Sequence, residues 1–99
     1  MLGPNGKIVI NMTWQQFQEY QRWDEFPERV DNPPFTADMV FWYGEKRYII
    51  AGIDAGVAIF EYDEYRMLVY DDNFLVMLQK PFVGKNSFKD LIEEILFED

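Results

Sequence analysis

The chain contains no cysteine and no histidine, and both absences limit the chemistry that it can perform. Without cysteine, disulfides, thiolate catalysis and thiolate metal sites are excluded. Without histidine, the chain lacks the usual general base and the commonest zinc ligand, so no Ser-His-Asp or Cys-His arrangement can form. The one serine, Ser87, precedes a helical pattern and is interpreted as a helix cap. We therefore expect a protein that is not an enzyme and that holds no cofactor.

Long apolar runs are also lacking, and we expect no signal peptide. No stretch approaches the roughly 20 apolar residues with which a helix crosses a bilayer. Met1–Lys7 lacks the basic start and the long apolar segment of a signal peptide. These features predict a cytoplasmic protein.

Basic residues are scarce, since 9 Lys and Arg stand against 18 Asp and Glu, giving a net charge of −9. Nucleic acid and anionic membranes would repel such a chain, so we expect neither as a partner. The charge suits a basic protein surface instead, although it would also keep a small domain soluble without any partner. With 99 residues, 48% of them hydrophobic, the chain is long and apolar enough for one domain over residues 1–99.

The first third of the chain predicts a helix followed by a loop. Thr13 is followed three residues later by a glutamine, which matches the capping-box pattern of a helix start. Residues 22–34 contain three prolines and predict a loop. Trp23 and Phe26 lie in this loop, and we interpret them as plugs over the core rather than as contact residues.

The middle of the chain predicts an antiparallel meander of three or four strands. Gly44-Glu45 suits a two-residue hairpin turn. Asp54-Ala55-Gly56 is expected to form a three-residue turn that ends in a left-handed glycine. The four β-prone runs are Phe35–Tyr43, Arg47–Ile53, Val57–Tyr62 and Tyr65–Tyr70.

Two helices are predicted after the strands. Asp71 or Asp72 is expected to cap a short helix over Asn73–Gln79. Ser87 then begins a second helix, whose apolar positions follow an amphipathic pattern. These positions are Phe88, Leu91, Ile92, Ile95 and Leu96. The predicted fold is therefore α+β: an antiparallel meander of three to four strands, with an N-terminal helix and two C-terminal helices packed on the sheet.

Apolar side chains are expected on both faces of this sheet, because both sets of alternating strand positions carry them. The predicted helices can cover one face. The second face must be covered by N-terminal segments, by another copy of the chain or by a partner. Within a single chain, the aromatic loop Trp23–Phe35 would have to fold across it.

Acidic residues gather between residues 54 and 72, where six acids accompany one base. Their oxygens would suit calcium, but they lack the alternating spacing and the glycine of an EF-hand loop. No metal site is therefore predicted. The four residues considered for calcium are Asp63, Glu64, Asp71 and Asp72.

From Phe35 onward, about two-thirds of the chain resembles a loose group of small, uncharacterised acidic proteins from Gram-positive bacteria and their mobile elements. The resemblance rests on an aromatic strand before a hairpin (FWYGEKRYII), on an acidic aromatic link (EYDEY) and on a C-terminal helical pattern (LVMLQKPFVGKNSFKDLIEEI). It implies an α+β fold with no assigned catalytic residue. In size and charge the chain also resembles inhibitors that block nuclease machinery and immunity proteins that neutralise toxins.

The first hypothesis is an inhibitor that occupies a basic, nucleic-acid-binding surface of a nuclease, effector or toxin, in an anti-CRISPR-like or other anti-defence role. Carboxylates would stand in for phosphates, and aromatic rings would anchor the contact. The predicted contact residues are Asp63, Glu64, Asp71, Asp72, Trp42 and Tyr62. Two alternatives stay open: an immunity protein that neutralises a bacterial toxin, and a homodimeric housekeeping module.

Overall fold

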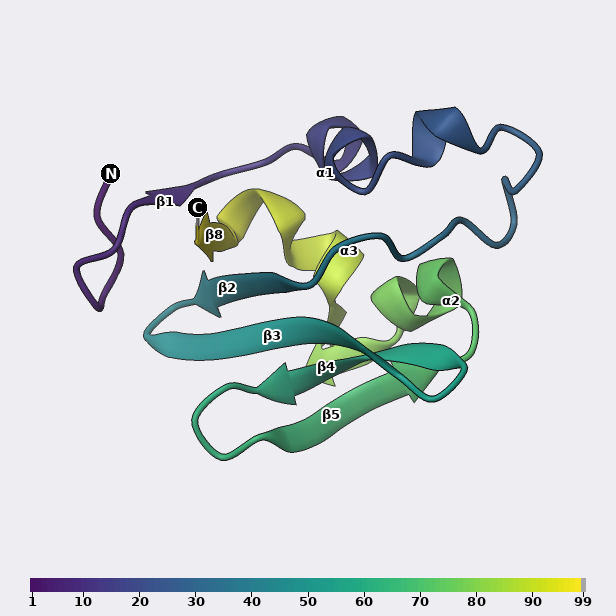
Figure 1. Cartoon of the computed structure of the whole chain (residues 1–99). Helices are drawn as coiled ribbons and strands as arrows, with labels where there is room; N and C mark the ends of the chain where they lie inside the picture. The colour runs from purple at the N-terminus through teal and green to yellow at the C-terminus, as the bar shows by residue number, and fades with distance from the viewer. Residues whose placement is uncertain (99) are drawn as a thin grey trace.

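A computed structural model describes residues 1–98, which contain eight strands, three α-helices and two short 3₁₀ turns (Figure 1). In chain order, the elements are β1 (Val9–Ile10), α1 (Trp14–Tyr20), η1 (Trp23–Glu25), β2 (Met39–Tyr43), β3 (Lys46–Ile53), β4 (Gly56–Glu61), β5 (Arg66–Asp71), α2 (Phe74–Gln79), β6 (Pro81–Val83), β7 (Asn86–Ser87), α3 (Phe88–Leu91), η2 (Ile92–Glu94) and β8 (Leu96–Glu98). The α+β class predicted from the sequence is thus confirmed.

The main sheet is antiparallel and has the strand order β1-β8-β2-β3-β4-β5. Strands β2 to β5 form the expected meander, in which Phe41 pairs with Tyr48 and Ile50 with Ile59. The turn between β2 and β3 lies at Gly44-Glu45, and Gly44 has the positive φ (63°) that favours glycine. Strands β6 and β7 form a separate hairpin.

The prediction of three to four strands is wrong, because the C-terminal residues add a strand instead of continuing a helix. The last helix, α3, is a single turn, and η2 follows it. Strand β8 then pairs with β2 and β1, which places Phe97 opposite Phe41. Pairing with β8 satisfies the edge of β2 and buries Phe97 at the same time. The apolar pattern after Ser87 therefore serves both a short helix and a strand.

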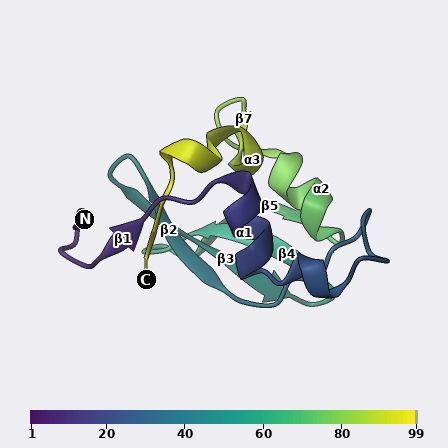
Figure 2. The same cartoon turned by 90° about the horizontal axis from the view of Figure 1, so that it is seen from above.

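All three helices pack on one face of the sheet, where the main core lies (Figure 2). Aromatic rings dominate this core, and Phe17 is its central contact, with ring centroids 5.0 Å from Phe88, 6.1 Å from Phe74 and 6.4 Å from Phe97. The largest fully buried apolar side chains are Phe17, Phe41, Phe74, Phe88, Phe97, Ile50, Ile59, Met77, Leu78, Ile95 and Val9.

The aromatic loop between α1 and β2 packs on this same helical side. Trp23 contacts the rings of Phe17 and Phe74, with centroids 5.9 Å and 5.7 Å apart, so its interpretation as a plug over the core is confirmed. The same interpretation of Phe26 is wrong, because Phe26 is not among the side chains packed on this core. Phe35 also packs on Phe74. The fully buried Gln21 fixes the loop, since its amide hydrogen-bonds with the backbone of residues 36 and 37. The loop therefore does not fold across the other face of the sheet.

Two helix starts match the sequence and one does not. Thr13 and Ser87 each form a complete capping box. The cap of α2 is Asn73, whose side chain accepts a hydrogen bond from the backbone N–H of Val76, so the prediction of Asp71 or Asp72 is wrong. The backbone N–H of Asn73 instead donates to Asp71, which lies at the end of β5.

The expected three-residue turn at residues 54–56 is also wrong. The turn has two residues, and Asp54, with φ 52°, adopts the left-handed conformation. Gly56 already belongs to β4 and has no positive φ. Within residues 1–98, no helix has the length and apolar character needed to span a membrane.

Candidate interaction surface

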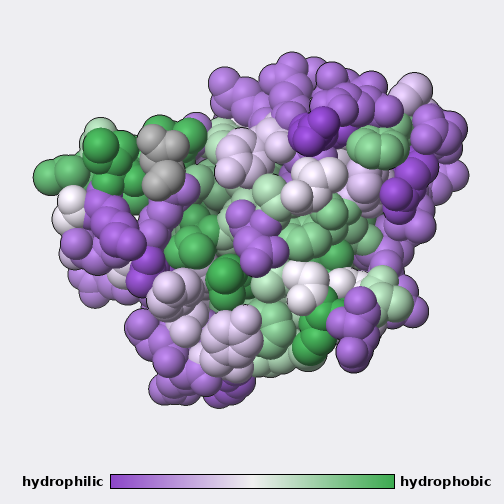
Figure 3. Space-filling model, viewed as in Figure 1, coloured by the Kyte–Doolittle hydropathy of each residue, from purple (hydrophilic) through white to green (hydrophobic). Residues whose placement is uncertain are grey.

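One face of the main sheet has no helix over it. Its side chains alternate along each strand with those of the helical core, and Figure 1 looks onto it. Apolar residues gather over β3 and β4 in this view, with hydrophilic residues around them (Figure 3). We call this surface the open sheet face; it consists of Val40, Trp42, Ile49, Ala51, Ile53, Ala58, Phe60, Tyr62, Met67 and Tyr70.

Small side chains occupy the centre of the open sheet face, and exposed aromatic rings lie at its border. Ala51 and Ala58 are small and pack with Phe60 into a second, minor core cluster. Tyr65 rests on Phe60 with ring centroids 4.8 Å apart, yet it is 62% exposed. Met67 is 43% exposed on the neighbouring strand. An apolar strip with exposed large side chains is typical of an interaction surface.

A charged pair lies among the aromatic rings at the β8 side of this face. The guanidinium of Arg47 donates to both carboxylate oxygens of Glu98, over 2.5 Å and 2.7 Å. The indole Nε1–H of Trp42 donates to Glu98 Oε2 over 2.9 Å. On the other side, the Arg47 guanidinium carbon lies 3.8 Å from the ring centroid of Tyr62, a cation–π contact. Two predicted contact residues, Trp42 and Tyr62, are thus connected through Arg47.

The hydrogen bonds from Arg47 hold the pKa of the Glu98 carboxyl below its usual value, and the bond from Trp42 adds to this effect. Because the folded-state pKa is lowered, the stabilisation is fully present above the unfolded pKa of about 4.3. It is lost as the pH falls through the folded-state value.

Replacing Glu98 with glutamine should lower the free energy of unfolding at neutral pH by about 1–2 kcal/mol, because a charge-assisted hydrogen-bond network is lost. The difference between wild type and Glu98→Gln should stay constant from pH 5 to 8 and shrink below about pH 4. Urea unfolding at several pH values measures it. The control is Glu93→Gln, which removes an exposed carboxylate on the helical side. If Glu98→Gln remained less stable than the wild type at low pH by the same free energy of unfolding, this result would contradict the assigned ion pair.

The structure does not bring the four predicted acids into one cluster. Asp63 and Glu64 lie in the turn between β4 and β5, whereas Asp71 and Asp72 lie at the other end of β5. A six-residue strand separates the two pairs by roughly 20 Å. In residues 1–98, no group of three or more acids is placed to hold a metal ion.

The two acids at the end of β5 differ in their partners. Asp71 forms an ion pair with Lys80 over 2.7 Å, and this contact, with a backbone hydrogen bond from Asn73, lowers its pKa. Asp72 accepts a hydrogen bond from the Tyr70 hydroxyl over 2.6 Å and forms no ion pair within the described residues.

Unbalanced negative charge therefore remains at both ends of the open sheet face. The nearby bases are already paired within the described residues: Lys46 and Arg66 with Glu61, and Arg47 with Glu98. Within residues 1–98, the acids that lie in the turns between β2 and β5 or directly after β5 and form no ion pair are Glu45, Asp54, Asp63, Glu64 and Asp72. We call these five residues the acidic ends.

Sequence reasoning missed the roles of Arg47, Glu98 and Tyr65. Arg47 and Glu98 lie 51 positions apart, and only the pairing of β8 with β2 brings them together. The sequence predicted Tyr65 as the first residue of a strand. In the structure it is instead the last residue of a turn, with a φ of 54°, and its ring packs on Phe60. A comparison of the chain with protein-family models, with curated proteins and with solved structures gives no match.

Proposed function

We propose that this protein is an acidic protein-binding module whose open sheet face contacts a basic surface of another protein. The observation that supports this proposal is the combination of an apolar strip without a helix over it and unpaired carboxylates at both of its ends. The apolar strip would supply the desolvated centre of a contact, and the acidic ends would supply its charged rim.

The exposed rings indicate where a partner would gain most of its binding energy. Tyr62 is 36% exposed and held by Arg47, while Tyr65 and Met67 project further. Trp42 is only 8% exposed, and its hydrogen bond to Glu98 fixes the surface around it. Tyrosine is a frequent hot-spot residue, because its ring is large and loses little conformational entropy.

A nucleic-acid-binding surface is the kind of basic surface that this arrangement suits best. Such surfaces place Lys and Arg along the path of the nucleic-acid backbone, where they contact its phosphates. The acids at both ends of the apolar strip would contact bases that are spaced along this path. The partner would be a nuclease or effector, and the role an inhibitory, anti-defence one. An immunity protein against a toxin would use the same surface, so the neighbouring genes distinguish the two: a toxin gene beside this gene favours immunity.

The test is affinity capture with a charge-reversal variant and a matched control. Asp63→Lys with Glu64→Lys changes one acidic end by four charge units. Glu93→Lys with Glu94→Lys makes the same change at two adjacent, exposed acids on the helical side. We expect the wild type and the control to retain the same basic protein from a host lysate. The Asp63/Glu64 variant should bind this protein about tenfold more weakly, since an interfacial charge pair contributes at least ~1.4 kcal/mol to the binding free energy.

Three results would overturn the proposal. The first is a partner whose binding does not depend on salt. The second is an equal loss in both charge-reversal variants. The third is a stable dimer in sedimentation at micromolar concentration that Tyr62→Glu with Met67→Glu dissociates, because a second copy would then occupy the open sheet face.

A further inference from the structure

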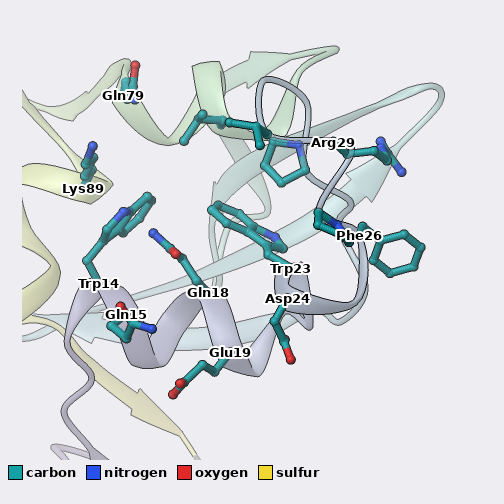
Figure 4. A pocket seen from close by; sticks show the side chains of 14 residues that line it. Trp14, Gln15, Gln18, Glu19, Trp23, Asp24, Phe26, Arg29, Gln79 and Lys89 are labelled. Atoms are coloured by element: carbon teal, nitrogen blue, oxygen red, sulfur yellow. The ribbon is translucent and has the colours of Figure 1, made fainter.

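A pocket of about 430 Å³ lies on the helical side of the molecule, between α1, η1 and α2 (Figure 4). Its volume falls within the range of about 300–1,000 Å³ that is common for small-molecule sites. Trp14 and Trp23 form its aromatic walls, with ring centroids 5.8 Å apart in an edge-to-face arrangement. The pocket is distinct from the open sheet face, which lies on the other side of the sheet.

The aromatic walls are fixed before any ligand arrives. Trp14 stacks on Phe17 at 5.5 Å, and the indole Nε1–H of Trp23 donates to the carbonyl of Pro34 over 2.9 Å. Both rings are therefore anchored in the core or in the loop backbone. Binding to such a preformed pocket costs less free energy, because its side chains do not have to be ordered when the ligand binds.

The charges around the pocket are unusual for this chain. Of its nine bases, six form ion pairs within the described residues, as expected where acids outnumber bases two to one. The other three are Arg29, Lys85 and Lys89, and two of them, Arg29 and Lys89, line this pocket. Lys89 thus lies at an aromatic pocket without an ion-pair partner among the described residues, an arrangement that suits an anionic group of a ligand.

The placement of the side chains supports this interpretation. The ammonium of Lys89 lies 5.0 Å from the ring centroid of Trp14, so a positive charge sits beside the indole. Glu19 and Asp24 belong to the same lining, but Figure 4 shows their carboxylates directed away from the two indoles and from Lys89. The polar groups that face the rings are amides, such as that of Gln18.

We propose that this pocket binds a small molecule with an aromatic or apolar body and a carboxylate group. The body would lie against Trp14 and Trp23, and the carboxylate would accept a charge-assisted hydrogen bond from Lys89. Arg29 lies in the loop at the other end of the lining, and Figure 4 shows its guanidinium directed away from the two indoles, so the contact with the carboxylate depends on Lys89.

The test compares three probes that share one body and differ in the charge of the head group: phenylbutyrate, phenylbutylamine and phenylbutanol. Binding is followed by NMR through the three indole N–H signals of the isotope-labelled protein. Trp42 serves as an internal reference, because it lies on the open sheet face. We expect phenylbutyrate to shift the signals of Trp14 and Trp23 and to bind about tenfold more tightly than the other two probes, a difference of ~1.4 kcal/mol.

Lys89→Gln should abolish the preference for the carboxylate, while Lys85→Gln, which removes an unpaired lysine from the exposed turn between β6 and β7, should leave it unchanged. An unshifted Trp42 signal in each variant shows that the fold is intact. Equal or tighter binding of the amine or the alcohol would overturn the proposal. The same holds for an equal loss in both lysine variants, or for no shift with any probe.

Discussion

Replacing Phe17 with alanine should lower the free energy of unfolding by about 3–5 kcal/mol, the range for removing a large ring from a closed core. Phe17 is fully buried and has ring contacts with Trp14, Trp23, Phe74 and Phe88. These contacts connect α1 to η1, α2 and α3, so no neighbouring element is free to collapse into the space. Equilibrium unfolding in urea measures the change.

The control for this prediction is Tyr20→Ala in the same helix. Tyr20 is one turn further along α1 and is 50% exposed, so its loss should change the free energy of unfolding by less than about 1 kcal/mol. If the two variants lost similar stability, then α1 would not be packed on the sheet through Phe17.

Replacing Gly56 with alanine should cost stability at the upper end of the ~1–3 kcal/mol range for overpacking. A Cβ added at this position would lie 2.5 Å from the carbonyl oxygen of Asp71 and 2.7 Å from the hydroxyl of Tyr70. The first contact is with backbone, so the β4–β5 pairing itself would have to shift. Thermal or urea unfolding detects the loss, and displacement of the Tyr70 ring should show in its NMR signals.

Gly52→Ala provides a matched control in the facing strand β3. There the nearest atom to an added Cβ is a ring carbon of Phe35 at 3.5 Å, which is ordinary van der Waals contact. We expect no loss of stability, because alanine also restricts the unfolded chain more than glycine does. If both substitutions destabilised the protein equally, the loss would come from replacing any glycine in these strands. The close contacts of position 56 with Tyr70 and Asp71 would then not be its cause.

Local signals in the sequence determined two of the three helix starts, one hairpin turn and the apolar character of both sheet faces. The capping boxes at Thr13 and Ser87 and the turn at Gly44 depend on residues within four positions of one another, so the sequence alone specifies them. The alternation along β2 to β4 likewise follows from neighbouring residues, and it predicted a second apolar face that the structure leaves without a helix.

Only the tertiary structure decided which distant residues meet. Strand β8 and the contact of Arg47 with Glu98 depend on pairings between segments far apart in the chain. The same is true of the closeness of Gly56 to Tyr70 and of Lys89 to Trp14. By their own pattern, the apolar positions from Phe88 to Leu96 fit an amphipathic helix, yet Leu96 lies in β8. The open edge of β2 and the core around Phe97 favour the strand, because it pairs the backbone and buries the ring at once.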